Sequence, residues 1–141
     1  MPNDADVFSV KAPASGLLAT LKMTRHEVAK ERVVVSMEVG PHVHQLHGIL
    51  HGGASVALAE TAASIAANVN CEEGYVALGQ EINANHLRSM RTGTLTAVAL
   101  PVHIGRRSQV WGVEIRDEAA RLVCVSRCTL AVVERPAPER A

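Results

Sequence analysis

Aromatic side chains are almost absent from this 141-residue chain: one Phe, one Tyr and one Trp make up 2% of it. Hydrophobic residues still account for 48%, so the core must be built from aliphatic side chains. This length and composition predict one domain with one core. We assign that domain to residues 15–134 and expect residues 1–14 and 135–141 to be flexible termini, because neither end shows hydrophobic periodicity.

The chain also lacks net charge, since 14 basic residues balance 14 acidic ones. This balance disfavours a general nucleic-acid or anionic-membrane partner. No apolar run approaches the roughly 18 residues that a membrane-spanning helix requires. The first residues, MPNDADVFSVKAPAS, have no continuous apolar stretch of the kind found in signal peptides. We therefore expect a cytoplasmic protein.

Cysteine is scarce too. Cys71, Cys124 and Cys128 form an odd set without a C-x-x-C motif. Cys124 and Cys128 have the same parity along a predicted strand and should point to one face. We interpret all three as reduced and mostly buried small hydrophobic residues in a cytosolic protein.

The order of predicted elements is two strands, one long helix and four strands. Short connections exclude parallel crossovers, so the sheet should be antiparallel. A single helix against one such sheet is an α+β arrangement. We predict strands at 18–26, 32–39, 75–87, 94–103, 109–116 and 122–133, with the helix at 54–70.

The predicted helix, ASVALAETAASIAANVN, is rich in Ala and contains a single charged residue, Glu60. An apolar stripe runs through Leu58 and Ile65, and Glu60 lies opposite it beside Ser64. The simplest interpretation is a solvent-exposed face. However, such faces usually carry several charges, whereas this one has small residues and hydroxyls. The composition of the face around Glu60 also suits a surface covered by a second subunit. There a partly desolvated carboxylate becomes a better base or nucleophile.

The segment HGGAS precedes this helix. Gly52 and Gly53 allow close approach of a ligand, and the first N–H groups of a helix have no helical partners. They could stabilise an oxyanion, although a plain turn into a helix would look the same. Gly53 and Glu60 are about 10 Å apart along a helix. One carbonyl group could therefore be reached by both only if two antiparallel helices met across a dimer axis.

Four histidines, His42, His44, His47 and His51, lie in the loop before the helix. Their spacing lacks a recognisable metal-site pattern, so we expect no metal. We expect His51 to orient the helix start. Gln45 could donate its amide N–H to a carbonyl oxygen, or it could be a surface residue.

The segments HQLHGILHGGASVALAE, QEINANHLRS and HIGRRSQVWGVEI closely resemble hotdog-fold thioesterases. The nearest branch resembles 4-hydroxybenzoyl-CoA, 1,4-dihydroxy-2-naphthoyl-CoA and enterobactin-proofreading thioesterases, and is related to phenylacetate-pathway thioesterases. The resemblance runs from about residue 18 to residue 133. It implies a hotdog fold, in which five or six antiparallel strands wrap one long central helix. It also implies an acyl-CoA thioesterase that needs no cofactor.

By this resemblance, Glu60 matches the catalytic carboxylate and Ser64 a hydroxyl residue beside it. Gln45 matches the residue that helps polarise the thioester carbonyl. His51 precedes Gly52, whose backbone N–H binds the same oxygen. The family places the acid and the oxygen-binding groups on different subunits, and its members are usually homotetramers built from two dimers.

Substrate-binding residues also follow from the resemblance. His86 matches a His near the acyl group, and the turn of Gly105, Arg106, Arg107 and Ser108 resembles one that contacts the nucleotide of CoA. Arginine suits phosphate recognition, and Arg88 and Arg91 lie at a further strand end, although ordinary turn arginines would look alike. Relatives commonly have Pro-Phe where this chain has Leu46-His47, which bears on the acyl group accepted.

The resemblance favours an aryl-CoA or a short to medium acyl-CoA as the substrate. Two alternatives keep the same fold. One is an acyl-thioester dehydratase or hydratase, which the HGGAS pattern followed by Glu60 disfavours. The other is a non-catalytic acyl-CoA-binding protein, for which neither Glu60 nor Gln45 would be needed.

Overall fold

A computed structural model describes residues 15–137 of the chain, so the predicted flexible segment 1–14 lies outside the described residues, as do residues 138–141. The elements are α2 (Leu17–Thr20), β1 (Met23–Ala29), β2 (Arg32–Val39), η1 (Pro41–Val43), α3 (Gly52–Asn68), β3 (Tyr75–His86), β4 (Gly93–Ile104), β5 (Ser108–Arg116) and β6 (Leu122–Glu134).

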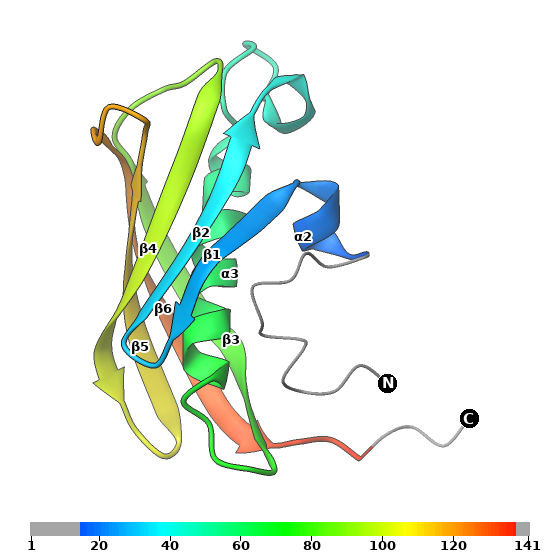
Figure 1. The fold of residues 1–141 in the computed structure, drawn as a ribbon, viewed down its shortest axis with the longest axis vertical. Coiled ribbons are helices and arrows are strands. Elements are labelled where there is room, and N and C mark those ends of the chain that lie inside the picture. Colours follow the sequence, from blue (N-terminus) through cyan, green and yellow to red (C-terminus); the bar gives the residue numbers. More distant parts are fainter. Residues whose placement is uncertain (1–14, 138–141) are drawn as a thin grey trace.

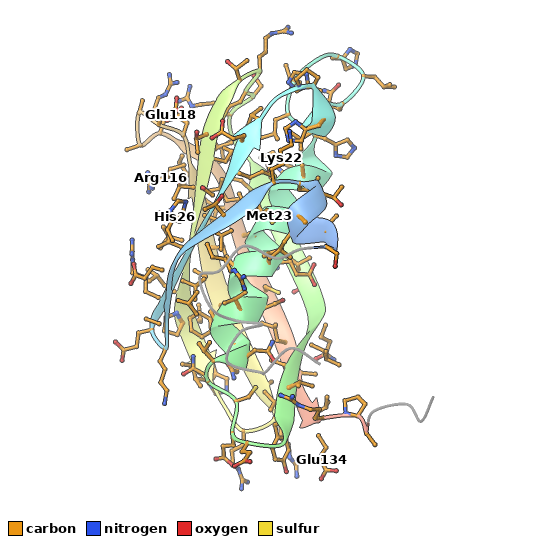
Figure 2. The ribbon with its side chains drawn as sticks, turned by 45° about the vertical axis from the view of Figure 1, so that its right-hand side comes forward. Lys22, Met23, His26, Arg116, Glu118 and Glu134 are labelled. Carbon is orange, nitrogen blue, oxygen red and sulfur yellow. The ribbon has the colours of Figure 1, made fainter. Side chains whose placement is uncertain are left out.

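The six strands form one sheet in the order β1-β2-β4-β5-β6-β3. Every neighbouring pair is antiparallel. The sheet curves around α3, which lies along its inner side (Figure 1). Figure 2 shows His26 and Arg116 on the side of the sheet away from the helix. The predicted hotdog arrangement, one long helix wrapped by an antiparallel sheet, is confirmed.

The core lies between α3 and the sheet and is aliphatic, as the composition predicts. Leu58, Ala62 and Ile65 of the helix are buried, and so is Trp111 of β5. The buried surface of α3 is wider than the predicted stripe, because Ala residues on both sides of it also contact the sheet. Small side chains let the helix lie close to the strands over its whole length.

The prediction of one strand over residues 18–26 is wrong at its start, and the observed strand also continues three residues beyond the predicted end, to Ala29. Leu17–Thr20 forms a helical turn, closed by the hydrogen bonds Thr20 N to Gly16 O (3.0 Å) and Leu21 N to Leu17 O (2.9 Å). The strand begins only at Met23, after Lys22 adopts a positive φ of 54°. An alternating pattern of a few residues does not separate a strand from a single helical turn.

The remaining strands and α3 lie within two residues of their predicted bounds. The three cysteines form no disulfide; Cys124 and Cys128 are buried and Cys71 is half-buried. Within residues 15–137, no helix has the length and apolar character needed to cross a membrane.

Candidate active site

The helix α3 begins at Gly52, two residues earlier than predicted, because His51 caps it. Nδ1 of His51 accepts a hydrogen bond from the backbone N–H of Gly53 at 2.8 Å. The side chain thus satisfies one of the four N–H groups that a helix start leaves without helical partners. The predicted role of His51 in orienting the helix start is consistent with this contact.

Gly52 lies directly beside the ring of His86. A Cβ atom at position 52 would lie 2.8 Å from Nε2 of His86, so no larger residue fits without displacing the ring. His86 is the last residue of β3, and its place on the inner side of the sheet brings it to the start of α3. The structure therefore brings two predicted site residues together from segments 34 positions apart.

A cavity of about 340 Å³ opens at this helix start. Its volume is near the lower end of the roughly 300–1,000 Å³ that is typical of small-molecule sites. Predicted site residues Gln45, Gly52, His86 and Arg88 line it. The rest of its wall consists of Ile49, Leu50, Ser55, Leu87, Ser89 and Val123.

The side chain of Gln45 is oriented by its own loop. Its Oε1 accepts a hydrogen bond from the backbone N–H of His47, and its backbone N–H donates to Ile49 O at 2.8 Å. Since Oε1 is occupied, Nε2 is the amide atom that remains to donate toward the cavity. Gln45 and Gly52 line the same small space, and each carries an N–H group.

Glu60 is not part of this cavity. It is half-buried on α3, two turns beyond the helix start, and its carboxylate lies against Gly79 of β3. It also lies close enough to Cys128 to affect the thiol: burial, and then the charges of Glu60 and Glu81, raise the pKa of Cys128 to about 12. Within one chain, Glu60 and the start of α3 therefore lie apart, as their spacing in the sequence predicts.

The helix face around Glu60 is half-buried rather than open to solvent. Thr61, Ser64 and Asn68 share this state with Glu60. Asn68 joins the helix to β3, because its side chain donates to Ala77 O at 2.9 Å and accepts from Ala77 N at 3.0 Å. The hydroxyl-bearing residue Ser64 lies one helical turn beyond Glu60, on the same side.

The predicted CoA-binding arginines separate into two groups. Arg106 and Arg107, in the β4–β5 turn with Gly105, line a second cavity of about 720 Å³ at the far end of α3. Ser108 is not in its wall; its carbonyl accepts a hydrogen bond from Gly105 N at 2.9 Å and closes the turn. Cys71 and Tyr75 also line this cavity.

Arg88 and Arg91 lie in the connection between β3 and β4, beside the loop that precedes α3. Arg91 supports this loop, since its Nη1 donates to Gly48 O at 3.1 Å. His44 makes a similar link, with its Nε2 2.7 Å from Arg91 O. One chain alone therefore does not bring the four arginines together.

Two residues at these places were not predicted from the sequence. Gly79 interrupts the β3 pattern and lies at a register shift of the β3–β6 pair, where a lone Gly signals a bulge or a close approach. Ser55 lines the cavity at the helix start, but nothing in its sequence context distinguishes it from the other small helix residues. Among residues 15–137, no three His, Cys, Asp or Glu side chains are grouped to hold a metal ion.

Comparison with known proteins decides the family. The family model described as "Thioesterase superfamily" matches residues 47–124, which include the helix start, α3 and β3 to β5. This chain belongs to the thioesterase superfamily. It is 48% identical over 120 residues to a 1,4-dihydroxy-2-naphthoyl-CoA hydrolase of Listeria monocytogenes, covering 85% of this chain and 98% of that protein.

Solved structures of similar proteins support the same family. A thioesterase from Haemophilus influenzae superposes with a TM-score of 0.84 at 40% identity, over 90% of this chain and 89% of that one. A Staphylococcus aureus protein superposes with a TM-score of 0.83 at 38% identity, over 85% and 100%. That structure carries a glutamate replaced by alanine. A second structure of the same protein, described as a thioesterase, carries a glutamine replaced by alanine, and this glutamine precedes the glutamate by 15 positions. Gln45 and Glu60 have the same separation here.

Proposed function

We propose that this protein is an acyl-CoA thioesterase that hydrolyses an aryl-CoA or a short to medium acyl-CoA to the free acid and CoA. The observation that carries the proposal is the cavity at the start of α3, which Gln45 and Gly52 line beside His86. In this proposal Gln45 Nε2 and the Gly52 N–H act as donors into it. Two donors converging on a small, partly apolar space suit the carbonyl oxygen of a thioester. Three free cysteines favour the cytoplasm as its location.

The catalytic acid comes from a second copy of the chain in this proposal. Glu60 lies about 12 Å along the helix from Gly52, which is too far for both to reach one carbonyl group. The strand β3 lies at the sheet edge, and its exposed residues include Tyr75 and Leu78. An exposed edge strand of 12 residues can pair with a second copy. Antiparallel pairing of β3 with its counterpart would bring Glu60 of one chain to the helix start of the other.

The resulting homodimer has two shared active sites, and two such dimers form a homotetramer by the family resemblance. The half-buried polar face of α3 supports this arrangement. Its small and hydroxyl-bearing residues would allow a partner helix to approach closely, leaving a narrow space for the substrate.

The reaction follows from these positions. Gln45 Nε2 and the Gly52 N–H polarise the thioester C=O and stabilise the charge that forms on its oxygen. In one route, a Glu60 oxygen attacks the carbonyl carbon, the C–S bond breaks, and CoA leaves as the thiolate; water then hydrolyses the mixed anhydride. In the other route, Glu60 removes a proton from water, which attacks directly. Ser64 is placed to position that water or the carboxylate.

The CoA moiety is bound by cations in this proposal. Arg106 and Arg107 face a cavity large enough for a nucleotide portion, and guanidinium groups bind phosphate oxygens in pairs. Gly105 and Ser108 hold the turn that presents them. Arg88, beside the helix-start cavity, and Arg91, in the adjoining loop, belong to the opposite end of the same chain, so CoA would contact arginines from both subunits.

The test is thiol release from a panel of aryl, short-chain and long-chain acyl-CoA esters, with Glu60→Gln beside the wild type. We expect hydrolysis of at least one class and a loss of about 10²- to 10⁴-fold in the variant. A wild type inactive on every ester, or a fully active Glu60→Gln, would falsify the proposal. Single-turnover hydrolysis in ¹⁸O-labelled water separates the two routes, because only the anhydride route incorporates the label into Glu60.

A further inference from the structure

The hydroxyl group of Ser55 has no hydrogen-bond partner within the described residues. Ser55 is 1% exposed, and its Oγ is buried. The residue nevertheless lines the 340 Å³ cavity at the start of α3, together with Gly52 and His86. A buried polar group therefore borders an empty space that the proposed function assigns to the substrate.

This hydroxyl group costs stability in the free protein. Burying a hydroxyl group without a hydrogen-bond partner is unfavourable. Ala, which differs from Ser only in lacking this hydroxyl group, has the highest helix propensity. Three of the other helix residues within six positions of Ser55 are Ala: Ala54, Ala57 and Ala59. A serine at this point is therefore unfavourable for folding unless a ligand supplies its missing partner.

The position of Ser55 indicates which part of a ligand it would meet. It follows Gly52 by three residues, so both lie on one side of the helix, roughly 4.5 Å apart along its axis. The cavity wall also includes the apolar side chains of Leu87 and Val123. With the thioester oxygen at the Gly52 N–H, the acyl group would extend along these apolar residues toward Ser55.

We infer that Ser55 is a specificity-determining residue, whose hydroxyl binds a hydrogen-bonding substituent on the acyl group. The inference rests on the proposed thioesterase function. The substituent is a hydroxyl or carbonyl group remote from the thioester, on either an aromatic ring or a short chain. An acyl group without such a substituent leaves Ser55 Oγ unpaired, as it is in the free protein, so it binds without the hydrogen bond that a substituted acyl group gains.

The experiment compares pairs of esters that differ by one hydroxyl group. In the aromatic series, benzoyl-CoA is compared with each of the three hydroxybenzoyl-CoA isomers. In the aliphatic series, butanoyl-CoA is compared with 3-hydroxybutanoyl-CoA. Wild type is compared with Ser55→Ala. The matched control is Ser126→Ala, because Ser126 Oγ of β6 is also buried without a partner among the described residues but does not line the cavity.

We expect Ser55→Ala to lower kcat/KM roughly tenfold for at least one hydroxylated ester and to leave its unsubstituted counterpart unchanged. Ser126→Ala should change neither. Both variants should melt at or above the wild-type temperature, since each removes an unpaired hydroxyl group. The series in which Ser55→Ala lowers kcat/KM identifies the acyl group as aromatic or aliphatic.

Two results would overturn the inference alone: an active wild type with unchanged kcat/KM in Ser55→Ala, or an equal loss on substituted and unsubstituted esters. A wild type that hydrolyses none of the esters defeats the proposed function, and the inference with it.

Discussion

Gly79 of β3 leaves room for the Glu60 carboxylate, which lies directly against the strand at this point. A Cβ atom at position 79 would overlap Oε1 of Glu60. The register of the β3–β6 pair shifts between Gly79 and Glu81, so the strand is irregular at the same point. The backbone of one sheet edge therefore helps to fix where the α3 carboxylate can lie.

Replacing Gly79 with Ala should lower kcat about 10- to 100-fold with little change in KM, because it displaces Glu60 from its place without touching the substrate donors. Steady-state kinetics on the best ester of the panel measures both constants. The control is Gly112→Ala on β5, where the nearest side-chain atom to the added Cβ is Val102 Cγ2 at 3.7 Å. Wild-type kcat in Gly79→Ala would show that the contact does not position the acid.

Mixed dimers test whether the active site is shared. One chain carries Glu60→Gln and the other Gln45→Ala, and the mixed species is isolated through two different affinity tags. With shared sites, one of the two sites in each mixed dimer has both changes and the other has neither, so about half of the wild-type activity should return. With sites contained in single chains, activity would stay at the level of the two inactive parents.

Most of the fold could be predicted from local patterns. The alternation in Arg32–Val39 and in Leu122–Glu134 specifies strands, and the Ala-rich segment between Gly52 and Asn68 specifies a helix. The helical turn at Leu17–Thr20 could not be predicted, because four residues carry too little periodicity and its end depends on the positive φ of Lys22.

The site could be predicted only in part. Spacing alone shows that Gly53 and Glu60 are too distant to serve one carbonyl group within a chain. The contact of Gly52 with His86 and the unpaired hydroxyl of Ser55 depend on how β3 lies against α3, which no local pattern specifies. Likewise, the sequence gives no sign that Arg91 binds Gly48 O in its own chain.

The turn between β5 and β6 predicts a pH-dependent contribution to stability. Asp117 accepts hydrogen bonds from the backbone N–H groups of Ala119 (3.0 Å) and Arg121 (2.9 Å), and from Arg121 Nε at 2.8 Å. Burial acts to raise the pKa of Asp117, but the hydrogen bonds and charge of Arg121, helped by Ala119, outweigh it and lower this pKa below its ordinary value.

A carboxylate whose pKa is lowered by folding stabilises the protein above the ordinary pKa, and this contribution disappears as the pH falls through the folded-state value. Asp117→Asn should therefore lower the melting temperature by a few degrees at pH 7, and the difference from wild type should shrink toward pH 3. Calorimetry at both pH values measures it. The control is Glu118→Gln at the exposed neighbouring position; a difference independent of pH would contradict the assignment.

A buried polar chain links the helix end to β5. Gln109, 1% exposed, donates from Nε2 to Ala67 O at 3.1 Å and accepts from Trp111 Nε1 at 3.0 Å. Gln109→Leu should lower the free energy of unfolding by about 1–3 kcal/mol, because Trp111 Nε1 would be left buried without an acceptor. Urea unfolding measures this change. Thr24→Leu, at an exposed position of β1 on the opposite edge of the sheet from β3, is the control and should change stability little.

The arginine pair in the β4–β5 turn should act on the CoA phosphates rather than on the reaction. Replacing both Arg106 and Arg107 with Ala should raise KM for an acyl-CoA about tenfold, since each guanidinium group can supply charged hydrogen bonds to phosphate. The same double variant should hydrolyse the matching acyl-pantetheine, which lacks the nucleotide and its phosphates, with unchanged KM. Arg127→Ala is the control, because Arg127 is exposed on β6 and does not line the 720 Å³ cavity. An equal rise in KM for both esters would show that the turn acts on the shape of the site and not through its charge.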